Sequence, residues 1–531
     1  MTTPSTMRIG FASIYSWRPH VEHLAFLARM AERAGHEAHF LTCDADFNTC
    51  YTRELRGRPG WQECMQCRLG GIRSYVTRNV LSIGSLAKEG AADASPASIE
   101  WARSSASTLG RFESDKDYES ADFQSRVARL LPTVQASYTA ARRWIESQRL
   151  DAVCIFNGRM DATRATFEAA KSLGVRVISV ERTWFGDGLQ LYPDEHCLGL
   201  QSVHRLMREW RDQPLTHAQA IRAASYAARR FLRLNQKEWR AYNVDAKTGA
   251  WPVQGGRRRV LLIPSSRNEV WGHADWTSPW GDALVAYDAL IEQLELKPQD
   301  LLLRCHPNWG ERIGLAGGEL SERHYSEWAE RRGIHTIASR DPTSTLGLME
   351  QCDAVVIANG SAVLEAGMLG KQVIAVAPSF FNEAGIHDDA TSPAALQELR
   401  MHADLPDGER RAKQARLQRQ TLRFAYTMVD RLPQYTEAVK ADATTRFRYD
   451  FEADPKRFID LIRSGVLLAN DDTHAPDAYA EAAVLARVAE RDWHGLLDEI
   501  EPHVLSLQPL KRRFLFQPID AIRRSMPVGD R

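Results

Sequence analysis

The segment Asn359-Gly360-Ser361 follows an apolar run, and Glu365 stands one helical turn further along the chain. A glycine allows a tight turn close to a ligand, and the amides that begin a helix attract anions. The Ser361 hydroxyl adds a donor there. The Glu365 carboxylate, on the same helical face, is suited to accept hydrogen bonds from sugar hydroxyls. A serine N-cap with an ordinary first-turn glutamate would explain the same residues without a ligand.

Two further stretches bring hydrogen-bond donors to the same half of the chain. The stretch LLLRCHPN contains Arg304 and His306 and then a proline, which cannot continue a strand ladder. An imidazole at that position can donate to a phosphate oxygen or assist a leaving group, and a structural histidine in a turn is the alternative. In IPSSRNEVWG, the hydroxyls of Ser265 and Ser266 are suited to a diphosphate. These stretches predict a site for a phosphorylated ligand.

Strand ends in the first half of the chain carry the remaining candidates. FNGRMDATR joins a strand to a helix, with Asn157 in the turn and Arg159 offering a fork of donors for a carboxylate or phosphate. The next strand ends at Glu181, which is the preferred general base or nucleophile, with a salt bridge to a neighbouring arginine as the alternative. The predicted catalytic residues are Glu181, Arg159 and His306. The residues predicted on the acceptor side are His20, Asn157, Arg182 and Asp187.

Four of the eight cysteines cluster near the N-terminus, at Cys43, Cys50, Cys64 and Cys67. Their irregular spacing favours reduced thiols, while a structural zinc site and a redox pair or disulfide stay open. No metal ion is otherwise predicted.

The composition limits the classes of function. The chain has 531 residues, 44% hydrophobic and 26% charged, with a formal net charge of zero. This balance disfavours a nucleic-acid partner. No apolar run reaches the roughly 18 residues of a membrane span, and the first residues lack the pattern of a secretory signal. We therefore expect a cytoplasmic protein.

Short apolar runs alternate with amphipathic helical segments, which predicts α/β domains with parallel sheets. The polar, glycine-rich stretch 245–259 indicates a linker. We predict two Rossmann-like domains that face a cleft, followed by helices. The predicted domains are an N-terminal acceptor-side domain with helical insertions (1–250), a C-terminal nucleotide-sugar-binding domain (251–393) and a helical C-terminal region (394–531).

The stretches FNGRMDATR, IPSSRNEVWG, LLLRCHPN and ANGSAVLEAGMLGKQVI together resemble bacterial GT-B-type glycosyltransferases of capsule and lipopolysaccharide biosynthesis, the Kdo transferase-like group. The resemblance implies that the second domain holds a nucleotide-sugar donor without a metal or another cofactor. It places His306 and Ser361 at the donor phosphate and Glu365 near the ribose. It also implies that Arg159 and Glu181 face the transferred sugar or the acceptor. The predicted donor-binding residues are Ser265, Ser266, Arg304, His306, Asn359, Gly360, Ser361 and Glu365.

The predicted activity is transfer of a sugar to a cell-surface polysaccharide or lipopolysaccharide acceptor, free or lipid-linked. A CMP-Kdo type of donor is favoured, and the lack of an acidic pair followed by glycine keeps UDP- and GDP-linked sugars open. The alternatives are a nucleotide-sugar epimerase or hydrolase, and a non-catalytic nucleotide-binding component of an assembly complex. Two basic segments with interspersed apolar residues, 222–242 and 409–426, either touch an anionic inner membrane or form half-buried helices.

Overall fold

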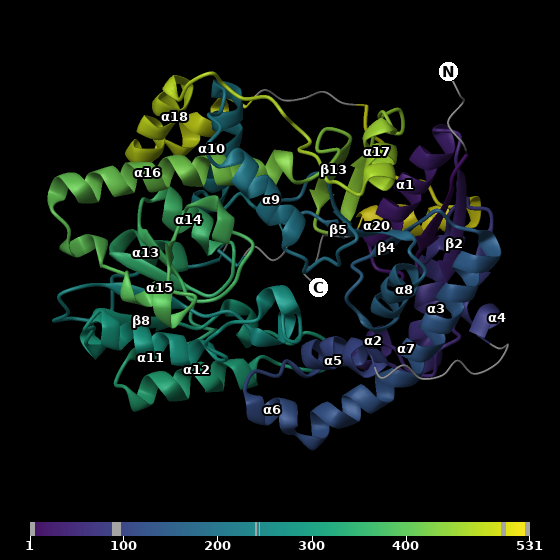
Figure 1. Ribbon diagram of the computed structural model, residues 1–531, viewed down its shortest axis with the longest axis horizontal. Helices are drawn as coiled ribbons and strands as arrows, with labels where there is room; N and C mark the ends of the chain where they lie inside the picture. Colours follow the sequence, from purple (N-terminus) through teal and green to yellow (C-terminus); the bar gives the residue numbers. More distant parts are fainter. Residues whose placement is uncertain (1–5, 88–96, 239–241, 244, 501–505, 526–531) are drawn as a thin grey trace.

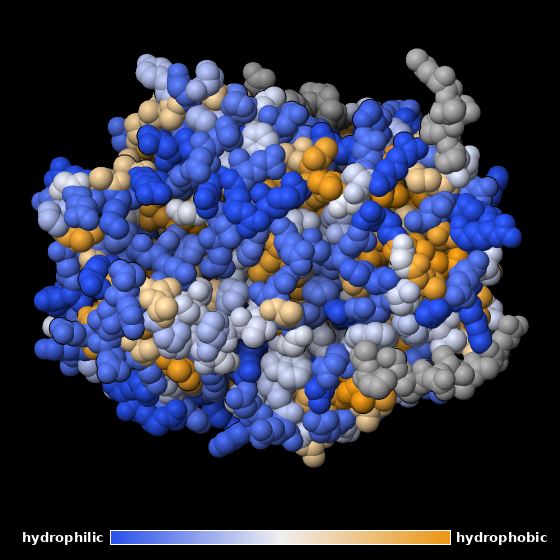
Figure 2. Space-filling model, in the orientation of Figure 1, coloured by the Kyte–Doolittle hydropathy of each residue, from blue (hydrophilic) through white to orange (hydrophobic). Residues whose placement is uncertain are grey.

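The computed structural model describes residues 6–87, 97–238, 242–243, 245–500 and 506–525. Two six-stranded sheets organise the chain, with the first on the right of Figure 1 and the second on the left. In the view of Figure 2 the surface is mostly hydrophilic, with hydrophobic residues in small groups. The predicted fold class, two Rossmann-like α/β domains with additional C-terminal helices, is confirmed.

The first sheet has the order β3-β2-β1-β4-β5-β6, and only the β5–β6 pair is antiparallel among its described strands. Strand β4 (AVCIF) is buried along its whole length, as expected for a strand covered on both faces. Its strands are β1 (Arg8–Ala12), β2 (Glu37–Thr42), β3 (Val80–Ser82), β4 (Ala152–Phe156), β5 (Arg176–Arg182) and β6 (Leu189–Pro193). The helices of this half are α1 (His20–Arg33), α2 (Tyr51–Arg56), α3 (Gly60–Gly70), α4 (Ile83–Ala87), α5 (Ala97–Gly110), α6 (Asp115–Glu119), α7 (Ala121–Gln148), α8 (Asp161–Ser172), α9 (Gln201–Trp210) and α10 (His217–Phe231).

The second sheet has the order β12-β11-β10-β7-β8-β9 and is parallel throughout its described strands. Its strands are β7 (Val260–Ile263), β8 (Leu301–Arg304), β9 (His335–Ile337), β10 (Ala354–Ile357), β11 (Gln372–Ala375) and β12 (Asp388–Asp389). Its helices are α11 (Ala283–Gln293), α12 (Glu319–Arg331), α13 (Thr345–Gln351), α14 (Ala362–Met368) and α15 (Pro393–Gln397).

Strand order reverses once in each sheet, between β1 and β4 and between β7 and β10. At such a switch point, the loops that follow the two strands leave in opposite directions and open a crevice where ligands bind. The topology therefore gives each domain one preferred place for a site.

The C-terminal region is not purely helical, which corrects the prediction for 394–531. Besides its helices it contains an antiparallel hairpin of β13 (Val439–Ala443) and β14 (Arg446–Tyr449). The hairpin returns to the first domain, where the Gly188 amide donates to the Val439 carbonyl at 2.8 Å. The hairpin strands alternate buried and exposed residues, so they contain no continuous apolar run of the kind that predicted the other strands. The helices of this region are α16 (Asp407–Tyr426), α17 (Lys456–Ser464), α18 (Tyr479–Glu490), α19 (Trp493–Asp498) and α20 (Gln517–Ser525).

Candidate active site between the two sheets

Glu181, near the end of β5, lies beside the switch point of the first sheet. Its carboxylate accepts a hydrogen bond from Asn157 Nδ2 at 3.1 Å, and its Oε1 lies 3.5 Å from Nδ1 of His20 at the start of α1. Asn157 follows β4 with a φ of 64°, a left-handed conformation that asparagine tolerates and that directs its amide toward β5. Three residues predicted from separate segments therefore lie together.

Burial changes the pKa values of Glu181 and His20 in a way that favours proton transfer. The side chains of His20 and Glu181 are only 12% and 17% exposed. Burial raises the pKa of Glu181 above its ordinary value, against the hydrogen bonds from Asn157 and the Arg182 amide. Burial, together with His23 and Arg182, holds the pKa of His20 well below its usual range, so the imidazole is neutral at pH 7. A carboxylate with a raised pKa beside a neutral imidazole can act as a general base near neutrality.

The other predicted residues of the first domain have protein partners. Arg159 donates to the Glu269 carbonyl at 2.7 Å and to Thr108 Oγ1 at 3.1 Å, and so connects the two domains. Arg182 donates to the Thr444 carbonyl at 3.0 Å, and burial lowers its pKa to about 10. Asp187 accepts from the Ala441 amide at 3.0 Å, which anchors the β13–β14 hairpin. All three side chains have partners within the protein, and their predicted roles in catalysis or acceptor binding stay predictions.

The loops at the switch point of the second sheet are joined by Ser265 and Asn359. Ser265 Oγ donates to the Asn359 carbonyl and accepts from the Asn359 amide at 3.2 Å. Gly360 follows with a φ of 135°, a conformation open to glycine but strained for other residues. Ser361 precedes α14 and makes no side-chain capping bond, so the ordinary N-cap interpretation does not account for it.

Glu365 pairs with an arginine that the sequence did not single out for this site. Arg230 of α10 donates to Glu365 Oε1 at 3.0 Å, to the Ser361 carbonyl at 3.2 Å and to both carboxylate oxygens of Glu238. Burial raises the pKa of Glu365, with Arg230 as the main opposing influence. The second carboxylate oxygen, Oε2, is buried without a hydrogen-bond partner among the described residues. Glu365 is thus held rigidly, with one acceptor unused.

The remaining donor-side candidates divide into two groups. His306 Nδ1 accepts from the Asn308 amide at 3.2 Å, which places the ring proton on Nε2 as a donor. Arg304 instead donates to the carbonyls of Ala338 and Asp341, and Ser266 Oγ accepts from Trp309 Nε1 at 2.7 Å. The last two side chains thus have structural partners, and the His306 ring packs near Trp309, so the ligand role of His306 stays a prediction.

Aromatic contacts bring the edges of the two sheets together. Trp184, three residues after Glu181, packs edge-on against Phe380 beyond β11 with a centroid separation of 4.3 Å. The Arg230 guanidinium lies 5.1 Å from the centre of the Phe185 ring while it also contacts Ser361. The loop after Glu181 therefore adjoins the loop that carries Ser361.

A second contact between the two domains, which the sequence did not predict, is centred on Glu113. Glu113, between α5 and α6, accepts from the Arg267 amide at 3.0 and 3.1 Å and from Ser321 Oγ at 2.7 Å. Nearby, the Tyr118 and Trp271 rings stack at 4.2 Å. Burial raises the pKa of Glu113 to about 7. The loop IPSSRNEVWG thus contacts the first domain, a long-range contact that has no sequence pattern.

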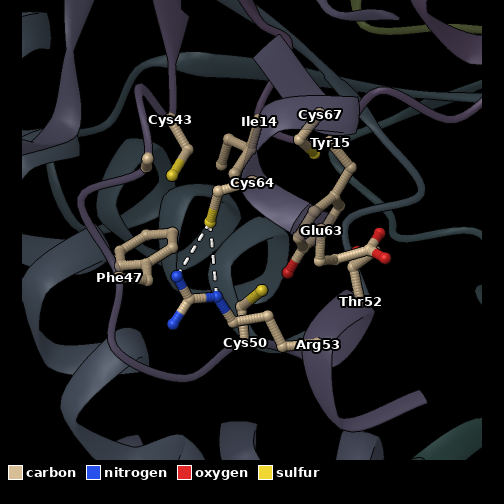
Figure 3. Close-up of a pocket in the computed structure, with 11 residues that line it drawn as sticks. Ile14, Tyr15, Cys43, Phe47, Cys50, Thr52, Arg53, Glu63, Cys64 and Cys67 are labelled. Atoms are coloured by element: carbon tan, nitrogen blue, oxygen red, sulfur yellow. Dashed lines mark hydrogen bonds between the residues drawn. The ribbon is translucent and has the colours of Figure 1, made fainter. Parts of the chain in front are cut away.

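The four clustered cysteines line one small cavity of about 20 Å³, shown in Figure 3. Arg53 donates to Cys64 Sγ at 2.9 and 3.3 Å, and all four are free thiols. Among the residues that the structure describes, no group of three or more His, Cys, Asp or Glu side chains is arranged to hold a metal ion. The four thiols therefore share one cavity, and zinc, a redox pair and a disulfide stay alternatives to reduced thiols.

Two Rossmann-like domains with adjoining strand ends define a GT-B-like fold. Known structures with a distant likeness include a Thermosulfurimonas dismutans KpsC β-Kdo 2,4 transferase, at 14% identity over 60% of this chain and 87% of that chain, TM-score 0.31. A β-Kdo 2,7 transferase, also KpsC of Thermosulfurimonas dismutans, matches at 10% identity over 66% and 89%, TM-score 0.31. The glycosyltransferase SnogD from Streptomyces nogalater matches at 14% over 78% and 95%, TM-score 0.22. No family model and no curated protein sequence matches the chain.

Proposed function

We propose that this protein is a glycosyltransferase that moves a sugar from a nucleotide-sugar donor to a hydroxyl of a polysaccharide or lipopolysaccharide acceptor. The observation that carries the proposal is the buried Glu181 carboxylate, held by Asn157 beside His20 near the end of β5. The loop that follows β5 adjoins the loop of Ser361 through Arg230. A base on one domain and an anion-binding loop on the other are what sugar transfer from a nucleotide requires.

In this mechanism the second domain binds the nucleotide phosphate through the Gly360 and Ser361 amides, the Ser361 hydroxyl and Nε2 of His306. These donors stabilise the charge that develops on the departing phosphate. Glu181 takes the proton of the attacking acceptor hydroxyl, and its raised pKa makes it a stronger base than an exposed carboxylate. The unused Oε2 of Glu365 accepts a hydrogen bond from a ribose hydroxyl.

Among donors, we favour a CMP-linked sugar of the Kdo type, on the resemblance of the His-Pro strand end and the later serine. The first test is a thermal-shift screen against CMP, UDP, GDP and their sugar conjugates. A ligand bound only by the native state raises the melting temperature by mass action. We expect one nucleotide to give a shift that Ser361→Ala and His306→Ala abolish. Ser326→Ala, at a half-buried position of α12 where the hydroxyl bonds only the Arg323 carbonyl of the same helix, should retain it.

The catalytic role is tested separately with Glu181→Gln, which keeps the size of the side chain. We expect unchanged nucleotide binding and a loss of transfer of about 10²- to 10⁴-fold, the usual contribution of a general base. Release of free sugar or of an isomer without an acceptor would identify a hydrolase or epimerase. Nucleotide binding with full polysaccharide production by Glu181→Gln would identify a non-catalytic component.

A further inference from the structure

Helix α3 exposes an apolar stripe to solvent. Trp61, Met65 and Leu69 follow one another at four-residue intervals and are 70%, 47% and 44% exposed. Because residues four apart share a helical face, the three side chains form one continuous row. Cys64 and Cys67, beside this row on the same helix, line the cavity in Figure 3.

A second exposed apolar segment runs from residue 514 into α20. Phe514 and Leu515 are both 82% exposed, and Ile519 and Ile522 are 49% and 59% exposed. Large apolar side chains with this much exposure are unusual when they occur together. Seven of the fifteen exposed large hydrophobic residues in the described part of the chain belong to these two segments.

Hydrogen bonds join the two segments into one surface. Arg512 Nη1 donates to the Leu69 carbonyl at 2.7 Å, and the Arg513 amide donates to the Ser74 carbonyl at 2.8 Å. Both helices lie on the right of Figure 1, on the side of the first sheet. We call this the α3–α20 surface, formed by Trp61, Met65, Leu69, Phe514, Leu515, Ile519 and Ile522.

The exposed charges within the two segments that form the α3–α20 surface are cationic. In residues 57–82 and 506–522 the exposed charged side chains are all cationic: Arg58, Arg68, Arg73, Arg78, Lys511 and Arg513. Of these, Arg73 pairs with Asp44 outside the two segments. The two acids of these ranges are occupied, since Glu63 is buried against Arg56 at 2.6 Å and Asp520 pairs with Arg512 at 2.7 Å. The surface is therefore apolar at its centre and positive around it.

We propose that the α3–α20 surface docks on an anionic lipid bilayer. The apolar side chains would enter the boundary between headgroups and acyl chains, while the cations would contact anionic headgroups. A second copy of this chain is a poor occupant, because a two-fold interface would bring like charges together. None of the helices in the described part of the chain has the length and apolar character to cross a membrane.

The two basic segments for which membrane contact was one alternative form half-buried helices instead. In the segment 222–242, α10 buries most of its side chains, including Arg230. In 409–426, the apolar residues from Leu417 onward are buried, while the exposed first half of α16 is polar. The α3–α20 surface also lies near the carboxyl end of β1, since Ile14 and Tyr15 line the cavity behind α3. The inference is independent of the proposed transfer reaction.

The test is co-sedimentation of the full chain with vesicles of phosphatidylcholine alone or with about one-third phosphatidylglycerol, at low and high salt. We expect binding only to the anionic vesicles, weakened by salt. Phe514→Ser/Leu515→Ser should reduce partitioning by more than tenfold, from the loss of two large apolar side chains. Arg68→Gln/Lys511→Gln should reduce it by about fivefold or more, from the loss of surface cations.

Tyr479→Ser is the matched control, because Tyr479 is 86% exposed on α18, away from this surface, and its loss should leave binding unchanged. No vesicle binding, or binding that all these variants retain, would overturn the proposal. So would a stable dimer that Phe514→Ser/Leu515→Ser dissociates, since the surface would then be a protein interface. Circular dichroism of each variant separates lost docking from lost folding.

Discussion

Replacing Arg230 by methionine tests whether the buried ion cluster of α10 and α14 holds the donor loop. Arg230 is 6% exposed at its side chain, and Glu238 and Glu365 are both 10% exposed. The methionine keeps much of the aliphatic volume but leaves two carboxylates without a cation. Removing one partner of a buried ion pair costs about 3–5 kcal/mol, mainly because a charge stays buried and unpaired. We expect a loss of this size in the region around α14.

Hydrogen exchange of the α14 amides measures this local free energy without requiring two-state unfolding of the whole chain. Arg416→Met is the control, because Arg416 is exposed on α16, and surface changes of this kind stay within about 0.5 kcal/mol. Adding Glu238→Gln and Glu365→Gln to Arg230→Met should restore most of the loss, since no charge is then buried.

The deficit should also depend on pH. Burial raises the pKa of Glu365 in the folded state, and removing Arg230 raises that pKa further. A raised carboxyl pKa means that the folded state favours the proton, so its stability falls as pH rises. Arg230→Met should therefore lose less stability at pH 5 than at pH 8. A deficit below about 1 kcal/mol, or one equal at both pH values, would refute this account of the cluster.

Three further predictions concern other parts of the chain. Burial raises the pKa of Glu113 to about 7, so the folded state favours the protonated carboxyl and the melting temperature should decline from pH 5 to pH 8. Glu113→Gln should flatten that decline, and an equal decline in both proteins would contradict the prediction. At Gly360 an added Cβ meets nothing closer than 3.9 Å, so the cost of Gly360→Ala comes from backbone strain alone and should be about 1–3 kcal/mol of stability. The substitution should also weaken nucleotide binding, and thermal shift measures both effects. Unchanged stability and binding would contradict the prediction. Iodoacetamide should modify Cys64, which lies beside the Arg53 guanidinium, before it modifies Cys43. Burial raises the pKa of Cys43 to about 11, which makes that thiol less reactive. Mass spectrometry that finds Cys43 labelled first would contradict this order.

Local patterns in the sequence were enough to predict the sheets and the strand ends that carry the candidate residues. Short apolar runs predicted the buried strands, and polar residues directly after those runs identified Asn157, Glu181, His306 and Ser361. This works because a strand buried on both faces must be apolar, and the residues that follow it must lie at one edge of the sheet. The β13–β14 hairpin was not predicted, because its strands have one polar, exposed face and so contain no continuous apolar run.

The sequence by itself determined the α/β class, the two domains and the loops in which chemistry could occur. Only the tertiary structure decided which side chains meet. Arg230 lies 135 positions from Glu365, and nothing in either local segment records their pairing. The same holds for Glu113, whose partners Arg267 and Ser321 lie in the second domain, and for the exposed stripe of α3. Burial and partners depend on packing between distant segments, whereas strand and helix patterns depend on neighbours in the chain.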